Sequence, residues 1–175
     1  MSHALNYKVN PSWRIGVVTS RFNKEITEKL LVGAIRKLSE LGVSAHQIES
    51  VSVPGAYEIP LAAKWLLEKK CHGVIALGAV IRGETGHYDF ICNSVERGCT
   101  TLQIESGKPV VFGVLTTEDE AQAINRSGGH HGHKGEDAVF VLIEMLNLYQ
   151  SLNPHKTKEH SHDRDQSHHS ESIFK

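Results

Sequence analysis

A polar loop with two glycines, from Arg82 to Gly86, carries the densest group of chemically useful residues in the sequence. Gly83 and Gly86 allow the backbone to approach a ligand closely, and Thr85 adds a hydroxyl group. The loop opens a predicted helix, whose free amides and positive dipole end suit a phosphate group. His87 stands at the same point, and histidine exchanges protons readily near neutral pH. The pattern indicates either a phosphate site with an acid–base group beside it, or a glycine-rich turn before a histidine whose ring hydrogen-bonds to backbone groups.

Other candidate residues follow the remaining predicted strands, and ligands of open parallel sheets bind beyond the carboxyl ends of the strands. Phe22 directly follows a strand in a polar stretch, where an aromatic ring either stacks on a planar heterocycle or plugs the core. Glu58 follows Pro54 and Gly55, where its carboxylate either accepts hydrogen bonds from a ligand or caps a helix N-terminus. If the strands lie side by side, we expect these loops to meet at one edge of the sheet.

Arg126 and Lys134 flank a loop that contains three glycines and three histidines. An arginine in such a place either grips a phosphate through two bonds or is a surface charge at the end of a helix. The histidines, His130, His131 and His133, suggest a metal site, but no cysteine or ordered set of carboxylates stands beside them. We therefore expect no metal ion at this loop.

The elements that must position these residues alternate along the chain between short β-rich runs and longer amphipathic patterns. The predicted strands cover residues 14–19, 48–53, 73–80 and 110–115. The predicted helices cover residues 26–41, 59–69, 89–105, 117–126 and 139–152. Such alternation predicts right-handed crossovers and a parallel sheet between two layers of helices.

Three local patterns refine this prediction. Thr117 and Glu120 have the spacing of a capping box, which predicts the start of the fourth helix. Gly42 follows the first helix and is expected to end it. The segment Tyr7–Val9 predicts an extra N-terminal edge strand, which either joins this sheet or pairs with another subunit.

The length of 175 residues indicates one domain, at residues 13–153, after an N-terminal arm at residues 1–12. Residues 154–175 are rich in histidine and charge, so we expect a disordered tail. With 19 basic and 20 acidic residues, the chain offers no broad field for nucleic acid or an anionic membrane. No window of about 20 apolar residues predicts a membrane span, and the start lacks an apolar signal core, so we expect a cytoplasmic protein.

The three cysteines, Cys71, Cys92 and Cys99, form no CxxC pair, which predicts free reduced thiols. Cys92 and Cys99 lie seven residues apart and therefore share one face of a predicted helix. The two residues form either a redox pair or metal site, or they are small core residues. We expect the second, because free cysteine commonly behaves as a small apolar residue.

Taken in order, five stretches resemble the lumazine synthase (6,7-dimethyl-8-ribityllumazine synthase) family, along about residues 13 to 152. These stretches are Thr19–Asn23, Val53–Pro60, Gly78–Phe90, Phe112–Thr116 and Ala123–Arg126. The resemblance implies an α/β, flavodoxin-like three-layer αβα sandwich with a central four-stranded parallel sheet, and no metal or organic cofactor. It further implies an enzyme that condenses 5-amino-6-(ribitylamino)uracil with 3,4-dihydroxy-2-butanone 4-phosphate. The products would be 6,7-dimethyl-8-ribityllumazine, phosphate and water, in the penultimate step of riboflavin biosynthesis.

Carried over by position, the resemblance assigns proton transfer to His87 and stacking on the pyrimidine ring to Phe22. The other residues implied for the pyrimidine and its ribityl chain are Ala56, Tyr57, Glu58, Ala79, Val80, Ile81 and Phe112. Those implied for the phosphate are Glu84, Thr85 and Arg126, with Lys134 and Asp137 as accessory residues. The chain departs from the family at Tyr57, where phenylalanine is more usual, and at His130, where many members have lysine.

In this family the site lies between neighbouring subunits, which implies that Phe112 and Arg126 face the loops of another chain. Members form pentamers, pairs of pentamers or sixty-subunit capsids. The seven residues between Arg126 and Lys134 resemble the short linker of the capsid-forming members. Riboflavin synthase is a further partner that the resemblance allows. Two alternatives stay open, namely a shell or scaffold protein of the same fold and a non-catalytic binder of flavins or nucleotides.

Overall fold

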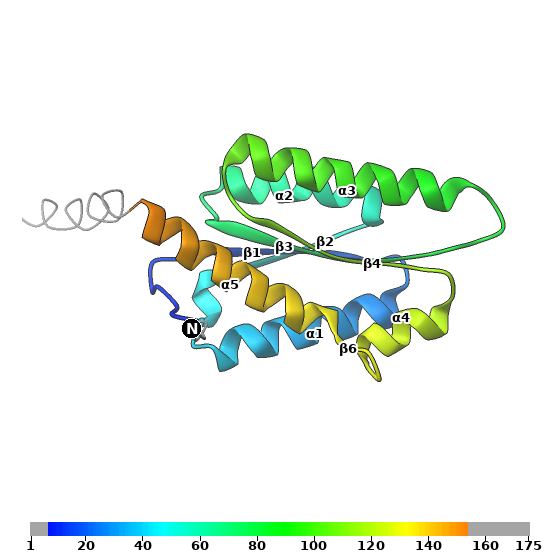
Figure 1. The fold of residues 1–175 in the computed structure, drawn as a ribbon, viewed down its shortest axis with the longest axis horizontal. Coiled ribbons are helices and arrows are strands. Elements are labelled where there is room, and N and C mark those ends of the chain that lie inside the picture. The colour runs from blue at the N-terminus through cyan, green and yellow to red at the C-terminus, as the bar shows by residue number, and fades with distance from the viewer. Residues whose placement is uncertain (1–6, 154–175) are drawn as a thin grey trace, which may run out of the picture.

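A four-stranded parallel sheet in the order β2-β1-β3-β4 forms the middle layer of the structure (Figure 1). The computed structural model describes residues 7–153. The strands are β1 (Ile15–Ser20), β2 (Ile48–Val53), β3 (Gly73–Ile81) and β4 (Val110–Thr117). All six residues of β1 are buried, as are the first seven of β3, because these two central strands have helices on both faces. The predicted α/β class and the four-stranded parallel sheet are confirmed.

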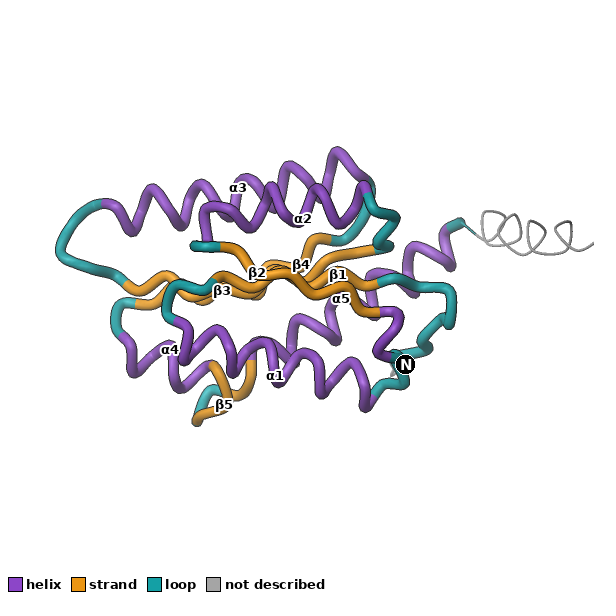
Figure 2. Tube along the Cα trace, turned by 180° about the vertical axis from the view of Figure 1, so that it is seen from behind, coloured by secondary structure: helices purple, strands orange, loops and turns teal. Residues whose placement is uncertain are grey.

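Two layers of helices enclose the sheet (Figure 2). On one face lie α1 (Lys24–Glu40), α4 (Glu120–Arg126) and α5 (Lys134–Leu152). On the other face lie α2 (Ile59–Glu68) and α3 (His87–Ser106). Two short 3₁₀ turns, η1 (Ala45–Gln47) and η2 (Ala56–Glu58), flank β2. The predicted three-layer arrangement is therefore present.

Each face of the sheet has its own apolar core, because successive strand residues point to opposite sides. Val17 belongs to the core beneath α1 and α5, where it joins Leu30 and Leu142. Val18, the next residue, belongs to the core beneath α2 and α3 with Ile59. The two cores fix the sheet between the helix layers, while the strand ends and parts of the edge strands β2 and β4 stay open to solvent.

Glycines end both α1 and α3, and the one after α1 is the stop that the sequence predicts. Gly42 lies just beyond α1 with φ of 91°, and Gly107 caps α3 with φ of 62°. Both values lie in the left-handed region that glycine adopts without steric cost. At its other end, α3 begins at His87, two residues before the predicted start.

The predicted capping box at Thr117 is wrong. Thr117 is the last residue of β4, where it pairs with Ile81, and its hydroxyl donates to the carbonyl of Asp119 at 2.8 Å. Asp119 is the N-cap of α4, and its carboxylate accepts a hydrogen bond from the Gln122 amide at 2.8 Å. The strand thus runs two residues further than predicted, and aspartate, itself a strong N-cap, takes the capping role.

The N-terminal segment and the loop after α4 also differ from prediction. Within residues 7–153, Tyr7–Val9 forms no strand in this sheet; instead the Tyr7 ring packs against Phe140 at 5.0 Å between ring centroids. The loop after α4 contains a short antiparallel pair, β5 (Ser127–Gly129) and β6 (Gly132–His133). Gly128 and Gly132 make this turn possible, with φ of 117° and 77°.

Two glycines let the β5–β6 pair and the start of α5 lie directly on α1. A Cβ atom at Gly33 would stand 2.1 Å from the His133 ring, and one at Gly135 would stand 2.2 Å from the backbone carbonyl oxygen of Leu30. The second contact is with backbone, which cannot rotate away. Close approach at Gly135 therefore fixes where α5 begins, including the position of Lys134.

We expect Gly135→Ala to destabilise the fold by about 1–3 kcal/mol, as overpacked sites commonly do, although alanine favours a helix by up to about 1 kcal/mol over glycine. Gly86→Ala is the matched control, because a Cβ atom there meets nothing within 4 Å and its φ is −66°. Urea denaturation of both variants measures the difference. Equal unfolding midpoints would contradict the close contact.

Candidate active site

The carboxyl ends of all four strands lie at the same end of the sheet. Ser20 pairs with Val53 in the register of β1 and β2, and Ile81 pairs with Thr117 in that of β3 and β4. The loops that follow these strands therefore gather at one edge, at the right-hand end of Figure 1. As in other open parallel sheets, this edge is the place for a ligand site.

Three of these loops are tied to one another by hydrogen bonds. The amide of Phe22 donates to the carbonyl of Pro54 at 3.1 Å, which joins the first loop to the second. The side-chain amide of Asn23 donates to the carbonyl of Ala79 at 2.9 Å, which joins the first loop to β3. Asn23 has φ of 57°, a conformation that asparagine tolerates better than most residues. The sequence prediction missed Asn23, although an asparagine between a strand and a helix is a signal for such a turn.

Two aromatic rings project from these tied loops. Phe22 is 71% exposed and Tyr57 is 60% exposed, whereas their neighbour Ala56 is buried. In this chain Phe22 is not a core plug, which leaves the stacking interpretation of the sequence. A rigidly held and exposed aromatic side chain offers a flat apolar face to a planar ligand.

Glu58 follows the capping interpretation of the sequence. Its Oε2 atom accepts a hydrogen bond from the amide of Gly55 at 2.9 Å and closes the turn η2. The carboxylate is half-buried and can accept further hydrogen bonds at its free lone pairs. The geometry confirms the structural role, and a ligand role stays a prediction.

The loop from Arg82 to Gly86 is solvent-exposed and leads directly into α3. The backbone amide of His87 donates to the hydroxyl of Thr85 at 3.4 Å, and α3 has no side-chain cap at its first turn. An uncapped helix start has amide groups and a partial positive charge to offer an anion. His87 is the first residue of this helix and is exposed, and its role in proton transfer stays a prediction.

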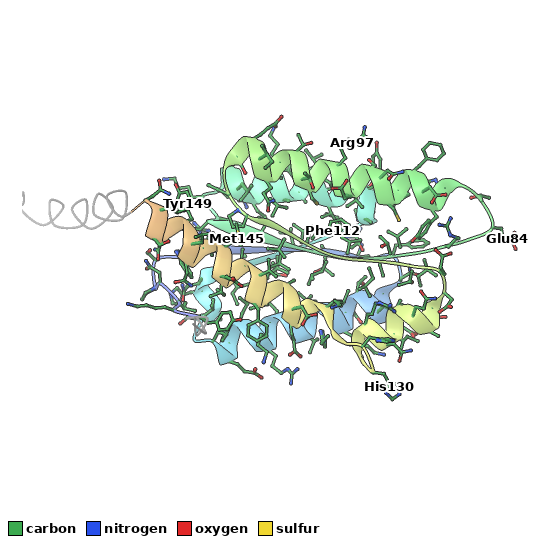
Figure 3. All side chains as sticks on the ribbon, in the orientation of Figure 1. Glu84, Arg97, Phe112, His130, Met145 and Tyr149 are labelled. Atoms are coloured by element: carbon green, nitrogen blue, oxygen red, sulfur yellow. The ribbon has the colours of Figure 1, made fainter. Side chains whose placement is uncertain are left out.

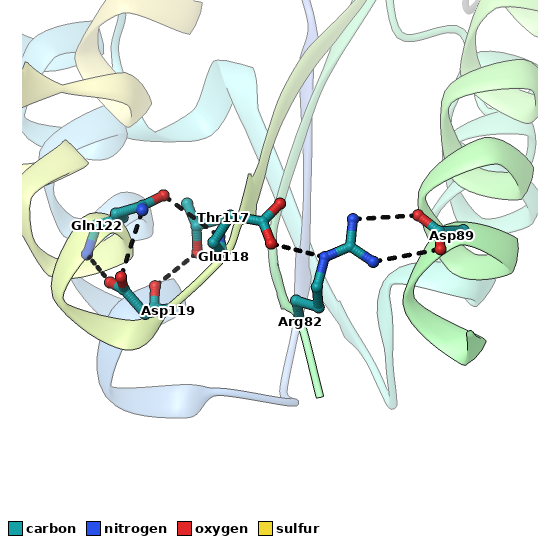
Figure 4. A network of polar contacts seen from close by, with 6 residues as sticks. All are labelled: Arg82, Asp89, Thr117, Glu118, Asp119 and Gln122. Atoms are coloured by element: carbon teal, nitrogen blue, oxygen red, sulfur yellow. Dashed lines mark hydrogen bonds and ion pairs between the residues drawn. The ribbon is translucent and has the colours of Figure 1, made fainter. Parts of the chain in front are cut away.

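Arg82 connects this loop to two other elements (Figure 4). Its Nη1 and Nη2 atoms donate to the carboxylate of Asp89 at 3.2 and 3.3 Å, and its Nε donates to Glu118 at 2.7 Å. The guanidinium also lies 4.1 Å from the centroid of the Tyr88 ring. Hydrogen bonds to Asp89 and Glu118 raise the pKa of Arg82 further above its already high range. No sequence pattern singled out this arginine.

The predicted residues beyond β4 lie on the α1 face of the sheet. Arg126 ends α4 and is half-buried, and its Nη1 atom donates to the carbonyl of Gln122 at 3.0 Å. Lys134 and Asp137 form an exposed ion pair at 2.7 Å in the first turn of α5. His130 is exposed at the tip of the β5–β6 turn (Figure 3). These positions leave their predicted ligand roles open.

Phe112 does not lie with the loops of its own chain. It pairs with Ala76 in the register of β4 and β3, five residues before Ile81 at the carboxyl end of β3. At about 3.3 Å per strand residue, the separation along the sheet is about 16 Å. Figure 3 shows Phe112 over the middle of the sheet and Glu84 at its far end. The ring is 40% exposed because β4 is an edge strand.

Two surface cavities in the described part of the chain are lined by none of the predicted site residues. One, of about 820 Å³, lies between α2 and α3, with Pro60, Phe90 and Arg97 in its lining. The other, of about 520 Å³, lies between α1 and the β5–β6 pair, with Glu28 and His133 in its lining. The loops at the carboxyl edge are themselves open to solvent in the single chain, since Phe22, Tyr57 and residues 82–87 are all exposed.

The cysteines are free thiols, as predicted, and they lie away from these loops or are poorly suited to react. Burial raises the pKa of Cys99 to about 12 and that of Cys71 above its usual range. Cys92 is half-buried, and burial raises its pKa too. Since the thiolate is the reactive form, these environments disfavour nucleophilic chemistry by cysteine. The buried position of Cys99 confirms its predicted role as a small core residue, whereas Cys92, for which the same role was predicted, is only half-buried.

Residues 7–153 contain no cluster of three or more histidine, cysteine, aspartate and glutamate side chains arranged to hold a metal ion. In the same range, no helix is both long enough and apolar enough to cross a membrane. The fold defines the class: a flavodoxin-like α/β protein whose candidate site residues lie mostly in loops at the carboxyl edge of its sheet.

The family model for 6,7-dimethyl-8-ribityllumazine synthase matches residues 12–150. The chain is 53% identical over 139 residues to the 6,7-dimethyl-8-ribityllumazine synthase of Bdellovibrio bacteriovorus, which covers 79% of this chain and 76% of that protein. It is 47% identical over 142 residues to the enzyme of that name from Coxiella burnetii, covering 81% and 94% of the two chains. The chain belongs to the 6,7-dimethyl-8-ribityllumazine synthase family.

Proposed function

We propose that this chain condenses 5-amino-6-(ribitylamino)uracil with 3,4-dihydroxy-2-butanone 4-phosphate to give 6,7-dimethyl-8-ribityllumazine, phosphate and water. One observation carries the proposal in a chain of this family. The exposed ring of Phe22 and the uncapped start of α3, with His87 beside it, lie at the same edge of the sheet. These features suit a planar heterocycle, a phosphate group and a proton transfer.

The pyrimidine would lie against Phe22, beside the tied first and second loops. Tyr57 and Glu58, with Ala56, would line the ribityl chain, since a carboxylate and exposed backbone suit a row of hydroxyl groups. Ala79, Val80 and Ile81 would offer backbone groups to the edge of the ring. Because the carbonyl of Ala79 already accepts from Asn23, its second lone pair is what remains for the ring.

The phosphate would bind at the start of α3, where free amides and the helix dipole favour an anion. Thr85 supplies a hydroxyl and Glu84 encloses the site, while Arg126 supplies the charge. Lys134 and Asp137 would be accessory residues at its border. In this proposal, the ion pair with Asp137 would orient the Lys134 ammonium group at the border of the site, and Lys134 would not bind the phosphate directly.

The reaction needs little beyond orientation and proton transfer. The ring amine attacks the ketone and loses water to give an imine, and elimination of phosphate leaves an enol that tautomerises to a second carbonyl. The ribityl-bearing nitrogen attacks that carbonyl and loses a second water to close the ring. Holding two reactants together can supply an effective molarity of about 10⁵ M or more. A positioned acid or base adds about 10²–10⁴-fold, and His87 is the group that would move the protons.

The open site of the single chain supports completion by a second copy. Phe112 lies too far from the loops of its own chain to contact the same substrate, yet it is exposed on an edge strand. We propose that Phe112 and Arg126 of one chain face the loops at the carboxyl edge of its neighbour. The site would then lie between subunits of a homo-oligomer.

The decisive experiment is to incubate the purified protein with both substrates and follow lumazine fluorescence. A shell protein or a non-catalytic flavin binder of this fold would give no lumazine fluorescence.

We expect His87→Ala to slow turnover by roughly 10–10³-fold, on the scale of acid–base catalysis or somewhat below it. His46→Ala is the matched control, because His46 is exposed before β2, at the opposite edge of the sheet. Unchanged turnover in His87→Ala would exclude the proton-transfer role.

Arg126→Ala should raise the KM of the ketone phosphate far more than that of the pyrimidine. Loss of a hydrogen bond to a charged group costs about 1.5–3 kcal/mol, or roughly 10–150-fold in affinity. Arg97→Ala, on the exposed middle of α3, is the control for general loss of charge. If the KM values of both substrates rose equally, Arg126 would be structural instead.

The assembly prediction follows from the linker between α4 and α5. The β5–β6 pair and its turn occupy residues 127–133, and the pair packs on α1 at Gly33. We expect this contact to set the angle between α4 and α5. A fixed angle of this kind decides whether closed symmetric shells can form. We expect light scattering at neutral pH to give a closed shell of about sixty copies. A particle with the mass of five or ten chains would contradict this.

A further inference from the structure

The contacts of Arg82 extend beyond the loop in which it lies. On one side the guanidinium holds Asp89 in the first turn of α3, two residues from His87. On the other side it holds Glu118 in the connection from β4 to α4, and its backbone amide donates to the carbonyl of Thr117 at 2.9 Å. Arg82 therefore bridges two elements that parallel strands alone would leave free to move apart.

The same network reaches Gln122 (Figure 4), which in turn contacts Arg126. The amide of Glu118 donates to the side-chain oxygen of Gln122 at 3.3 Å. The carbonyl of Gln122 accepts from Arg126 at 3.0 Å. A continuous series of hydrogen bonds thus connects the helix turn that carries His87 with the arginine at the end of α4.

Two other roles for Arg82 fit the geometry poorly. As a phosphate ligand, it would have to give up bonds to two carboxylates, whose negative charge repels an anion. As a source of stability it contributes little, because its partners Asp89 and Glu118 have side chains that are 58% and 59% exposed, and exposed ion pairs commonly contribute about 0–1 kcal/mol. The remaining role for Arg82 is to fix the relative positions of the first turn of α3 and the connection from β4 to α4.

We propose that Arg82 is a positioning residue, which fixes the start of α3, and with it the phosphate position, against the connection from β4 to α4. This inference rests on the proposed condensation reaction. Arg82 touches no reacting atom and acts through Asp89 and Glu118. Without it, the loop from Gly83 to Gly86 would sample a wider range of positions, and the phosphate would meet its ligands less often in the productive arrangement.

The test compares Arg82→Gln with Arg14→Gln. Arg14 makes a similar exposed ion pair with Glu49, at 2.9 Å, but at the opposite edge of the sheet. We expect Arg82→Gln to lower kcat roughly tenfold and to raise the KM of the ketone phosphate about fivefold, since misplacement by about 1 Å can cost about 100-fold. The KM of the pyrimidine should change by less than about twofold. Arg14→Gln should leave all three constants unchanged.

Hydrogen–deuterium exchange gives a readout that does not depend on the reaction. Amides of residues 83–91 should exchange faster in Arg82→Gln, and those of β1 should not. Arg82→Lys, which keeps the charge but not the fork of three bonds, should behave like Arg82→Gln rather than like the parent. Glu118→Gln should reproduce part of the effect and add little to Arg82→Gln in the double variant.

Each failure has a distinct signature. If the parent protein makes no lumazine, the proposed function falls, and the catalytic part of the inference falls with it. If the parent is active and Arg82→Gln matches it in both kinetics and exchange, Arg82 is not a positioning residue. Equal rises in both KM values, with faster exchange throughout the chain, would show a general structural defect and would also overturn the inference.

Discussion

Burial of the sheet on both faces is the constraint on which the rest of this structure depends. The hydrogen-bonded strands β1 and β3 have no side chain free to meet solvent along most of their length. Charged residues therefore stand only beyond the ends of these two strands. Because the strands are parallel, their carboxyl ends coincide, and every strand-to-helix loop emerges at one edge. The crowding of chemistry there follows from the packing of the two apolar cores.

That crowding is organised by polar contacts rather than by apolar packing. Backbone bonds from Phe22 and a side-chain bond from Asn23 tie the first three strand ends together. Arg82 ties the third to the fourth through Glu118. The aromatic rings of Phe22 and Tyr57 remain outside these bonds and exposed. The loops are held by hydrogen bonds while their apolar side chains stay exposed. This surface can therefore be covered by a ligand or by another chain.

The sequence predicted the strands well because burial on both faces gives unbroken apolar runs, as in residues 73–80. It predicted the helices because apolar residues recur at helical spacing and glycines follow them. The predicted capping box at Thr117 was wrong because a second residue suited to cap a helix, Asp119, lies two positions later and is the N-cap. For the site, the sequence located the loop from Arg82 to His87 but not the bonds that hold it. Asn23 and Arg82 depend on partners 56 and 36 residues away, and no local pattern encodes such pairs.

Arg82 and Arg126 differ in whether carboxylates of the same chain compensate their charge. Arg82 meets two carboxylates, so its charge is compensated within the fold. Arg126 donates to a backbone carbonyl, and within residues 7–153 no carboxylate lies within ion-pair distance of it. A carbonyl orients a guanidinium without neutralising it, so Arg126 keeps its full charge and several free N–H groups for an anion. The acceptor that each arginine meets therefore decides whether its charge is compensated by carboxylates, as in Arg82, or is not, as in Arg126.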